Sequence, residues 1–136
     1  MKTKAIVLDT NAYSELMRGN GPVSEILGEA GVVIMTPFVI GELEAGFRGG
    51  SRYEKNKAQL REFLNLAPVR QISTSPRTPE LFGELKDALK KNGIKVPVDD
   101  VWIAAAAKEY DAEVLTFDEH FAMMAEYGVK VSKLKS

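Results

Sequence analysis

The chain has 136 residues, of which 45% are hydrophobic, and a net charge of -1 at pH 7. This length and hydrophobic content are enough for one domain that buries roughly two-thirds of its unfolded surface, so we expect a single domain over residues 1–136. The absence of cysteine excludes disulfides and thiolate metal sites, and the nearly balanced charge excludes a protein that coats nucleic acid by bulk electrostatics alone.

The first residues of the chain predict neither export nor a membrane span. Two lysines, Lys2 and Lys4, are followed by a short apolar run that breaks at Asp9. A signal peptide or a membrane-spanning helix needs a longer uninterrupted apolar stretch. The expected location is therefore the cytoplasm, with no membrane partner.

Short apolar runs alternate along the chain with segments of helical periodicity. Apolar runs without polar alternation are typical of strands buried on both faces of a parallel sheet. Such strands are predicted over residues 4–9, 32–35 and 114–117. Edge strands are predicted over 129–132 and, more weakly because of Arg70 and Gln71, over 69–73. Helices are predicted over residues 10–19, 22–30, 38–47, 52–66, 75–93, 101–107 and 119–127. Strands that alternate with helices predict a single α/β domain.

Local signals indicate how three of these helices begin or end. The side chain of Thr10 or Asn11 is expected to cap the start of the first helix. Gly31 is expected to end the second helix in the left-handed conformation that glycine adopts most easily. Gly128 is expected to end the last helix.

Four acidic residues stand where charge is seldom placed without a reason. Asp9 and Asp118 follow predicted buried strands, whereas Glu42 interrupts an apolar helix. Asp100 begins a buried helix. Alone, each can be interpreted as a helix cap, a turn residue or an exposed side chain. Because carboxyl ends of parallel strands meet at one edge of a sheet and buried charges are paired or bind metal, the four together predict a divalent cation site.

The composition limits which cation such a site takes. Without cysteine, the ligands must be oxygen atoms or the only histidine, His120. Oxygen ligands favour hard cations such as Mg²⁺ or Mn²⁺. His120 lies next to Asp118 in sequence, and we expect it to be an outer or surface group rather than the catalytic base.

Charge is unevenly distributed along the chain. Residues 46–61 carry a single acid, Glu54, among five basic side chains, which are Arg48, Arg52, Lys55, Lys57 and Arg61. Residues 109–126 carry acids and neither lysine nor arginine. This distribution predicts a basic lip above an acidic floor. The alternative that the basic segment is simply the solvated face of an amphipathic helix stays open.

Four short strings along nearly the whole chain resemble the PIN-domain nucleases and, among them, the VapC-type toxins of toxin-antitoxin pairs. The strings are LDTN at 8–11, GELEAGF at 41–47, DDVWIAAAA at 99–107 and LTFDEHF at 115–121. No single string is decisive, but their order and separation match the family. The resemblance implies a three-layer α/β/α domain with a five-stranded parallel sheet in the order 3-2-1-4-5.

The resemblance also implies roles for individual residues. The metal-binding and catalytic quartet of the family corresponds to Asp9, Glu42, Asp100 and Asp118. Asn11 and Thr116 match polar positions that would orient ligands or water. Asp99 stands where many relatives have asparagine, so the third metal ligand could be Asp99 instead of Asp100. The spacing between Asp100 and the string WIAA matches the family and favours Asp100. Trp102 is expected in the core rather than against a base.

The function implied by the resemblance is that of a metal-dependent endoribonuclease. Such a toxin of a type II pair would use Mg²⁺ or Mn²⁺ to cut single-stranded or looped RNA. A cognate antitoxin would hold it inactive, and a homodimer is the common state of its relatives. The candidate RNA contacts are Arg48, Arg52, Lys55 and Lys57.

Two other classes of protein stay open as alternatives. One is a PIN fold that binds without catalysis. The other is a phosphotransfer or receiver domain, which is disfavoured because Asn11 stands two residues after Asp9, where haloacid-type phosphatases have a second acid. A receiver would also have a lysine near the end of a late strand, where this chain has Thr116 and Asp118.

Overall fold

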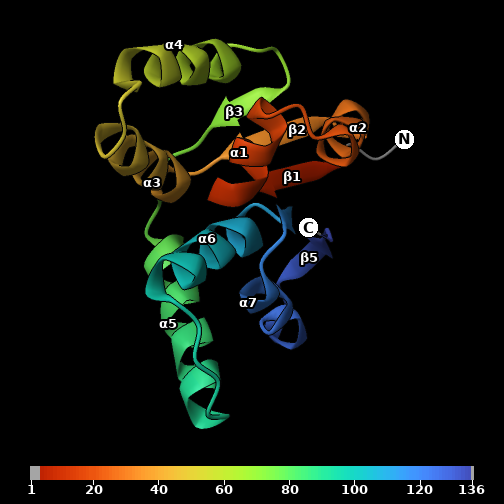
Figure 1. The fold of residues 1–136 in the computed structure, drawn as a ribbon. Coiled ribbons are helices and arrows are strands. Elements are labelled where there is room, and N and C mark those ends of the chain that lie inside the picture. Colours follow the sequence, from red (N-terminus) through yellow and green to blue (C-terminus); the bar gives the residue numbers. More distant parts are fainter. Residues whose placement is uncertain (1–3, 136) are drawn as a thin grey trace.

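A five-stranded parallel sheet lies at the centre of the computed structural model, which describes residues 4–135. The strand order is β3-β2-β1-β4-β5, as predicted, with β3 and β5 at the edges. The strands are β1 (Ala5–Leu8), β2 (Val32–Met35), β3 (Val69–Gln71), β4 (Glu113–Thr116) and β5 (Lys130–Lys133), and Figure 1 shows their arrangement.

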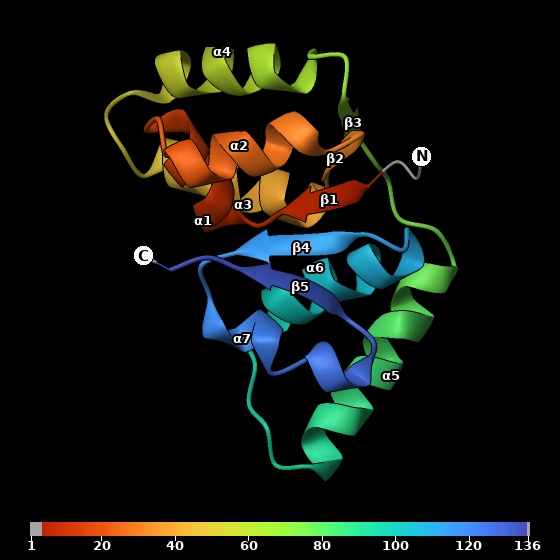
Figure 2. The same cartoon turned by 90° about the vertical axis from the view of Figure 1, so that its right-hand side faces the viewer.

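Helices lie on both faces of this sheet, which gives the predicted three-layer order. They are α1 (Thr10–Met17), α2 (Gly21–Glu29), α3 (Pro37–Arg48), α4 (Tyr53–Leu64), α5 (Arg77–Lys91), α6 (Val98–Glu109), α7 (Glu119–Ala122) and the 3-10 helix η1 (Ala125–Tyr127). Figures 1 and 2 place α4 and α5 at opposite ends of the molecule. Within residues 4–135, no helix combines the length and the apolar character needed to cross a bilayer.

The central strands β1 and β4 lie side by side with their carboxyl ends level. Leu8 pairs with Leu115, and the backbone N–H of Asp9 donates to the carbonyl of Leu115 at 3.4 Å. The centres of both strands are apolar and covered on both faces, and Leu8 and Leu115 are fully buried. The strand order reverses at this pair, so polar residues that follow β1 and β4 open into the crevice where open α/β sheets bind ligands.

Helix α6 brings two further acids to the same crevice. It contains four buried alanines, Ala104–Ala107, whose small side chains let neighbouring elements approach closely. Asp99 and Asp100 occupy its first turn, where the positive end of the helix dipole favours carboxylates. The predicted start at residue 101 is three residues too late, because the segment after Pro97 is already helical.

Trp102 joins three helices rather than filling the centre of the core. Its ring stacks on Phe82 of α5 at 3.8 Å between ring centroids, and on Phe38 of α3 at 5.4 Å. The side chain is half-buried. The stack fixes α6 against α3 and α5. The core position expected for Trp102 is not confirmed, because the residue packs between helices and stays half-buried.

Two of the predicted helix caps are wrong. The first helix is capped by Asp9, whose carboxylate accepts the N–H of Ala12 at 2.8 Å, and not by Thr10 or Asn11. The second helix ends at Ala30 in extended backbone, and Gly31 is not left-handed. The chain enters β2 directly at that point, so an extended conformation is needed there.

The C-terminal helical segment is interrupted. The single helix predicted over residues 119–127 is divided into α7 and η1, with Met123 and Met124 between them. Met124 is buried, which anchors the interruption against the core. Gly128 has a φ of +90° and ends η1 in the left-handed conformation, as predicted.

Candidate active site

The acids predicted to converge line one pocket at the carboxyl ends of β1 and β4. This acid pocket has a volume of about 280 Å³. Its lining residues are Asp9, Thr10, Asn11, Glu42, Pro97, Asp99, Asp100, Ile103, Asp118 and His120. They come from α1, α3, α6 and the β4–α7 junction, which lie far apart in sequence. A larger hollow, of about 420 Å³ near the end of α5, gathers no comparable group of acids.

Asp9 is the most buried acid of the pocket. It is 4% exposed, and its carboxylate is held from two sides, by the N–H of Ala12 at 2.8 Å and by the hydroxyl of Thr116. Burial raises the pKa of Asp9 above its ordinary value, although both hydrogen bonds oppose the shift. The orientation of this carboxylate is therefore fixed by the protein before any ligand binds.

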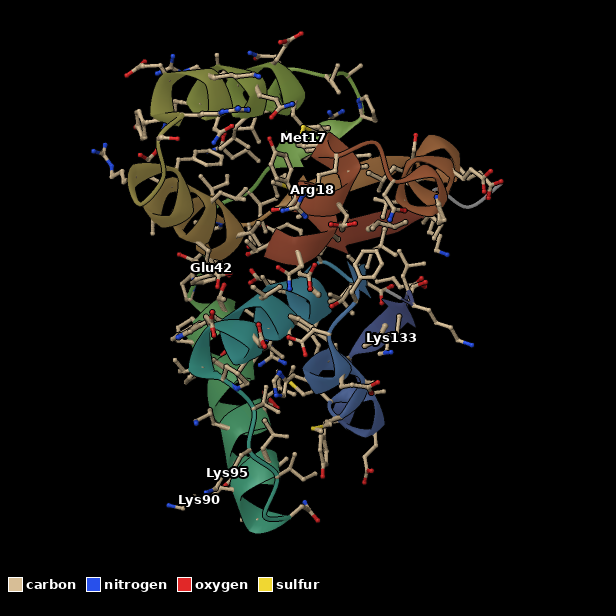
Figure 3. The ribbon with its side chains drawn as sticks, in the orientation of Figure 1. Met17, Arg18, Glu42, Lys90, Lys95 and Lys133 are labelled. Atoms are coloured by element: carbon tan, nitrogen blue, oxygen red, sulfur yellow. The ribbon has the colours of Figure 1, made fainter. Side chains whose placement is uncertain are left out.

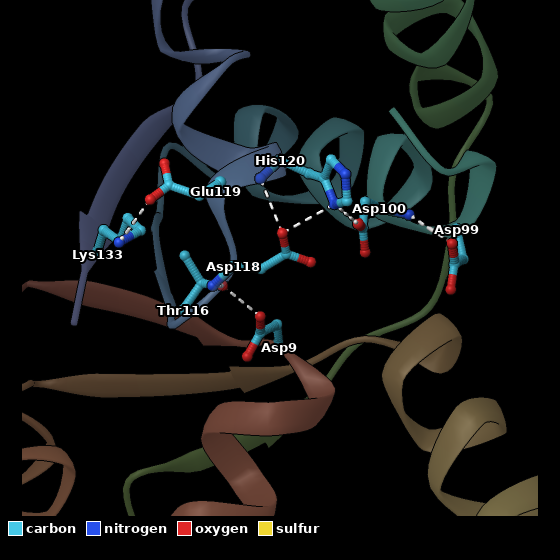
Figure 4. Close-up of polar contacts among 8 residues, drawn as sticks. All are labelled: Asp9, Asp99, Asp100, Thr116, Asp118, Glu119, His120 and Lys133. Carbon is cyan, nitrogen blue, oxygen red and sulfur yellow. Dashed lines mark hydrogen bonds and ion pairs between the residues drawn. The ribbon is translucent and has the colours of Figure 1, made fainter. Parts of the chain in front are cut away.

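Thr116 connects the ends of the two central strands. It is completely buried at the end of β4. Its hydroxyl donates to Asp9 and accepts the N–H of Asp118 at 2.8 Å, as Figure 4 shows. One side chain thus sets the positions of two acids, which is the orienting place that the resemblance implied.

Asp118 and His120 form a pair at the start of α7. The carboxylate of Asp118 accepts the backbone N–H of His120 at 2.8 Å. The ring Nδ1 of His120 lies 2.8 Å from the same Asp118 oxygen and 3.6 Å from Asp100, but its alignment makes a hydrogen bond to neither. Figure 4 shows the ring between the two acids. His120 thus lies beside two acids of the pocket, and the expectation that it is an outer or surface group rather than the catalytic base stays a prediction.

Asp100 faces the other acids of the pocket, whereas Asp99 is turned toward Glu42. The side chain of Asp100 is 13% exposed. Burial first, and then the charges of Asp118 and Asp99, raise the pKa of Asp100 to about 7, while His120 opposes the shift. Asp100 therefore lies close to Asp118 and His120, and its role as the third ligand stays a prediction.

Glu42 and Asp99 behave as a coupled pair of carboxyl groups. Burial and a hydrogen bond with Asp99 raise the pKa of Glu42, and the same hydrogen bond lowers the pKa of Asp99. Two neighbouring carboxylates cannot both ionise easily, so Glu42 holds a proton more tightly than Asp99 does. Thr10 also donates to Glu42 at 2.5 Å. Nothing in the sequence indicated this contact, which spans 32 residues.

The donor set of the pocket fits a divalent cation. Ligand atoms of Asp100, Asp118 and His120 all lie within 4.8 Å of one another. Asp9 and Glu42 add carboxylates to the other walls. Carboxylate oxygens suit Mg²⁺ and Mn²⁺, and an imidazole nitrogen is an acceptable further ligand for Mn²⁺. Burial is the main cause of the raised pKa values of Asp9, Glu42 and Asp100, and the charges of neighbouring acids add to it.

The predicted basic lip divides into two kinds of residue. Arg48 and Lys57 both pair with Glu44, with 2.9 Å between the Arg48 Nε and the Glu44 carboxylate. Lys57 is the main reason that the pKa of Glu44 is lowered to about 2. Arg52 and Lys55 are exposed and make no ion pair within residues 4–135. Residues 46–61 are therefore neither wholly a basic lip available to a ligand nor wholly the solvated face of a helix.

Asn11 has a different environment from the acids. It is exposed and lies on the second position of α1, where it lines the acid pocket. Asn11 therefore lies beside the acids, and its role in orienting a ligand or water stays a prediction.

The metal-free protein is expected to lose stability as the pH rises from about 4 to about 7. The folded protein raises the pKa of Asp100 from 3.8 to about 7, so it binds this proton more tightly than the unfolded chain. The stabilising contribution is complete below the unfolded value and disappears by about pH 7. Thermal melts in EDTA should therefore show Asp100→Asn becoming more stable relative to wild type across this window. Parallel curves for the two proteins would contradict the raised pKa.

Comparisons with known proteins agree with this fold. Residues 6–127 match the family model of the PIN domain. Ribonuclease VapC4 from Mycobacterium tuberculosis is 25% identical over 95% of this chain and 98% of its own length. VapBC2 from Rickettsia felis, solved bound to a promoter DNA fragment, superposes with a TM-score of 0.82 at 20% identity, over 96% of this chain and 99% of that one. VapBC-1 from nontypeable Haemophilus influenzae superposes with a TM-score of 0.83 at 21% identity, over 95% and 97%.

These likenesses extend over the whole arrangement that positions the acids. The matched residues 6–127 begin in β1 and end in η1, so they include every acid of the pocket. The match is to the PIN domain and not to a phosphotransfer or receiver domain. The chain belongs to the PIN-domain family.

Proposed function

We propose that this protein is a metal-dependent endoribonuclease that acts as the toxin of a type II toxin-antitoxin pair. The observation that carries the proposal is the convergence of Asp9, Glu42, Asp100 and Asp118 on one pocket at the switch point of the sheet. The similarity to a protein named ribonuclease VapC4 supports RNA as the substrate. The likeness to structures named VapBC supports a partner protein of the antitoxin kind.

The four acids are proposed to hold Mg²⁺ or Mn²⁺. A bound divalent cation supplies charge neutralisation at the cleaved phosphate and a more acidic water. The protein's own residues hold the carboxylates in place. Thr116 fixes the Asp9 carboxylate, and Asp118 is held at the start of α7 by its bond to the His120 N–H. His120, Asp99 and Asn11 are proposed to position the acids or the RNA rather than to react.

The partner protein, oligomeric state and cellular location that we propose follow from the same resemblance. A cognate antitoxin is expected to cover the acid pocket and prevent cleavage. A homodimer in the cytoplasm is the proposed working state. Gel filtration of the purified protein, alone and with its partner, tests the assembly.

The decisive test of the proposed function is cleavage of a mixed RNA pool by purified protein. Cutting should require added Mg²⁺ or Mn²⁺ and stop with excess EDTA. A DNA pool of the same sequences is the matched control and should stay intact. Protein that binds Mn²⁺ and RNA but cuts no RNA would instead identify a PIN fold retained for binding.

A further inference from the structure

A second hollow lies beside α1 and has the opposite charge to the acid pocket. Its volume is about 440 Å³, and residues of α1, α3 and α4 line it. Three of its lining residues, Arg18, Arg52 and Lys55, are cationic, and none is acidic. This hollow, the basic pocket, also includes Tyr13 and Ser14.

The protein neutralises the positive charge of the basic pocket only in part. Arg52 and Lys55 are exposed and make no ion pair among residues 4–135. Arg18 pairs with Glu15, yet its side chain remains 70% exposed. A concave surface with this charge attracts an anionic ligand.

Tyr13 provides a second, independent sign of a ligand. This residue lines the basic pocket and is only 2% exposed. Its ring packs edge-on against Phe63 at 5.3 Å. The hydroxyl has no hydrogen-bond partner among the described residues. A buried hydroxyl without a partner is costly, so a small movement that brings this hydroxyl to a ligand oxygen in the pocket would remove an existing penalty.

One face of α1 connects the two pockets. Asn11, Ser14 and Arg18 follow at spacings of three and four residues, which places them on one side of the helix. Asn11 lines the acid pocket, and Ser14 and Arg18 line the basic pocket. A third hollow includes all three together with Lys135 and with Glu15, which pairs with Arg18. The path is about 10 Å long, from a rise of 1.5 Å per residue. In the view of Figure 3, Arg18 lies between α4 and Glu42.

We propose that an RNA strand lies along this face of α1, with the phosphates next to the cleaved bond bound in the basic pocket. The inference rests on the proposed function. One RNA strand can place a phosphate at the acid pocket, where a cation would receive it, and further phosphates against Arg18, Arg52 and Lys55. An acidic peptide would match the basic pocket but would be repelled at the acid end of the path.

Binding of a fluorescent single-stranded RNA of mixed sequence tests the path. All proteins carry Asp9→Asn, so that the RNA stays uncut. The pair Arg52→Gln and Lys55→Gln should weaken binding and lower the slope of log affinity against log salt by about 1.4, from roughly 0.7 per phosphate contact on a single strand. Tyr13→Phe should weaken binding by about fivefold, which is one hydrogen bond, without lowering thermal stability.

The matched control removes two lysines elsewhere. Lys86 and Lys90 lie on α5, at the opposite end of the molecule from α4, and Figure 3 marks Lys90 there. Lys86→Gln with Lys90→Gln should change the slope much less. If both double variants lose the same amount of RNA affinity, the inference is overturned, because the net charge of the protein alone would then explain binding. Unchanged RNA binding by the Arg52 and Lys55 pair, with reduced binding of polyglutamate, would assign the pocket to an acidic protein segment.

Failure of this inference can be separated from failure of the proposed function. Wild-type protein that cuts RNA, together with pocket variants that bind RNA as tightly as their parent, would overturn the path alone. Wild-type protein that neither cuts nor binds RNA would overturn both.

Discussion

Replacement of Asp9 or Asp100 by asparagine is expected to reduce RNA cleavage by at least about 1,000-fold. A catalytic cation contributes several kcal/mol to the stability of the transition state, and each roughly 1.4 kcal/mol corresponds to a tenfold change in rate. Both acids are largely buried, so solvent cannot replace a lost carboxylate. Cleavage rates at saturating Mn²⁺, measured from labelled RNA, give the comparison.

The fold should survive these substitutions, which makes the loss interpretable. Asparagine caps helices about as well as aspartate, so the Asp9→Asn variant keeps the start of α1. Asp87→Asn is the matched control, because Asp87 lies on α5, where it pairs with Lys91. It should leave the cleavage rate unchanged. Asp9→Asn protein that cuts at the wild-type rate would show that the acid pocket is not the centre of the reaction.

Asp99→Asn distinguishes the two adjacent aspartates. Asp99 is turned toward Glu42, and an asparagine can still hydrogen-bond to that carboxyl group. We expect a loss of no more than about 100-fold, the usual range for a group that supports a metal ligand. A larger loss in Asp99→Asn than in Asp100→Asn would mean that the third ligand is Asp99.

Thr116→Val is expected to weaken both the fold and the cleavage reaction. Valine has nearly the shape of threonine, but it cannot donate to Asp9 or accept the N–H of Asp118. Each buried polar group left without a partner costs about 1–3 kcal/mol of the free energy of unfolding. Loss of a group that orients metal ligands reduces metal affinity or activity by about 10–100-fold. Urea unfolding and Mn²⁺-dependent cleavage measure the two effects.

Thr116→Ser separates the hydroxyl from the methyl group. Serine retains both hydrogen bonds and loses one buried methyl, which costs about 1 kcal/mol. Its cleavage rate should stay close to that of wild type. A valine variant as active as the serine variant would show that the hydroxyl of Thr116 has no part in orienting the acids.

The sheet could be predicted from the sequence because its strands are locally unambiguous. Val7 and Leu8 lie in an unbroken apolar run, and Leu115 in another, so both central strands were evident. Their order required the resemblance to the PIN domain, since pairing between distant segments leaves no local signal. The ends of helices were less predictable. Asp9 serves as both cap and pocket acid, which displaced the cap expected at Thr10 or Asn11.

Convergence of the acids could also be predicted, but their contacts could not. Parallel strands bring Asp9 and Asp118 to one edge whatever side chains surround them. The contact between Thr10 and Glu42 depends on how α1 and α3 pack, and it spans 32 residues. Packing between helices likewise lets Glu44 form ion pairs with Arg48 and Lys57. Arg52 and Lys55 form no ion pair within the described residues.

Parallel titration of Mn²⁺ binding and RNA cleavage tests the central claim most directly. Calorimetry gives the Mn²⁺ concentration that half-saturates the protein, and cleavage of labelled RNA gives the concentration that half-activates it. If the convergent acids hold the working cation, the two concentrations should agree in wild type, and Asp9→Asn should lose both binding and cleavage. Cleavage that persists in EDTA, or Mn²⁺ binding that is unaffected by Asp9→Asn, would contradict a metal-dependent nuclease built on these acids.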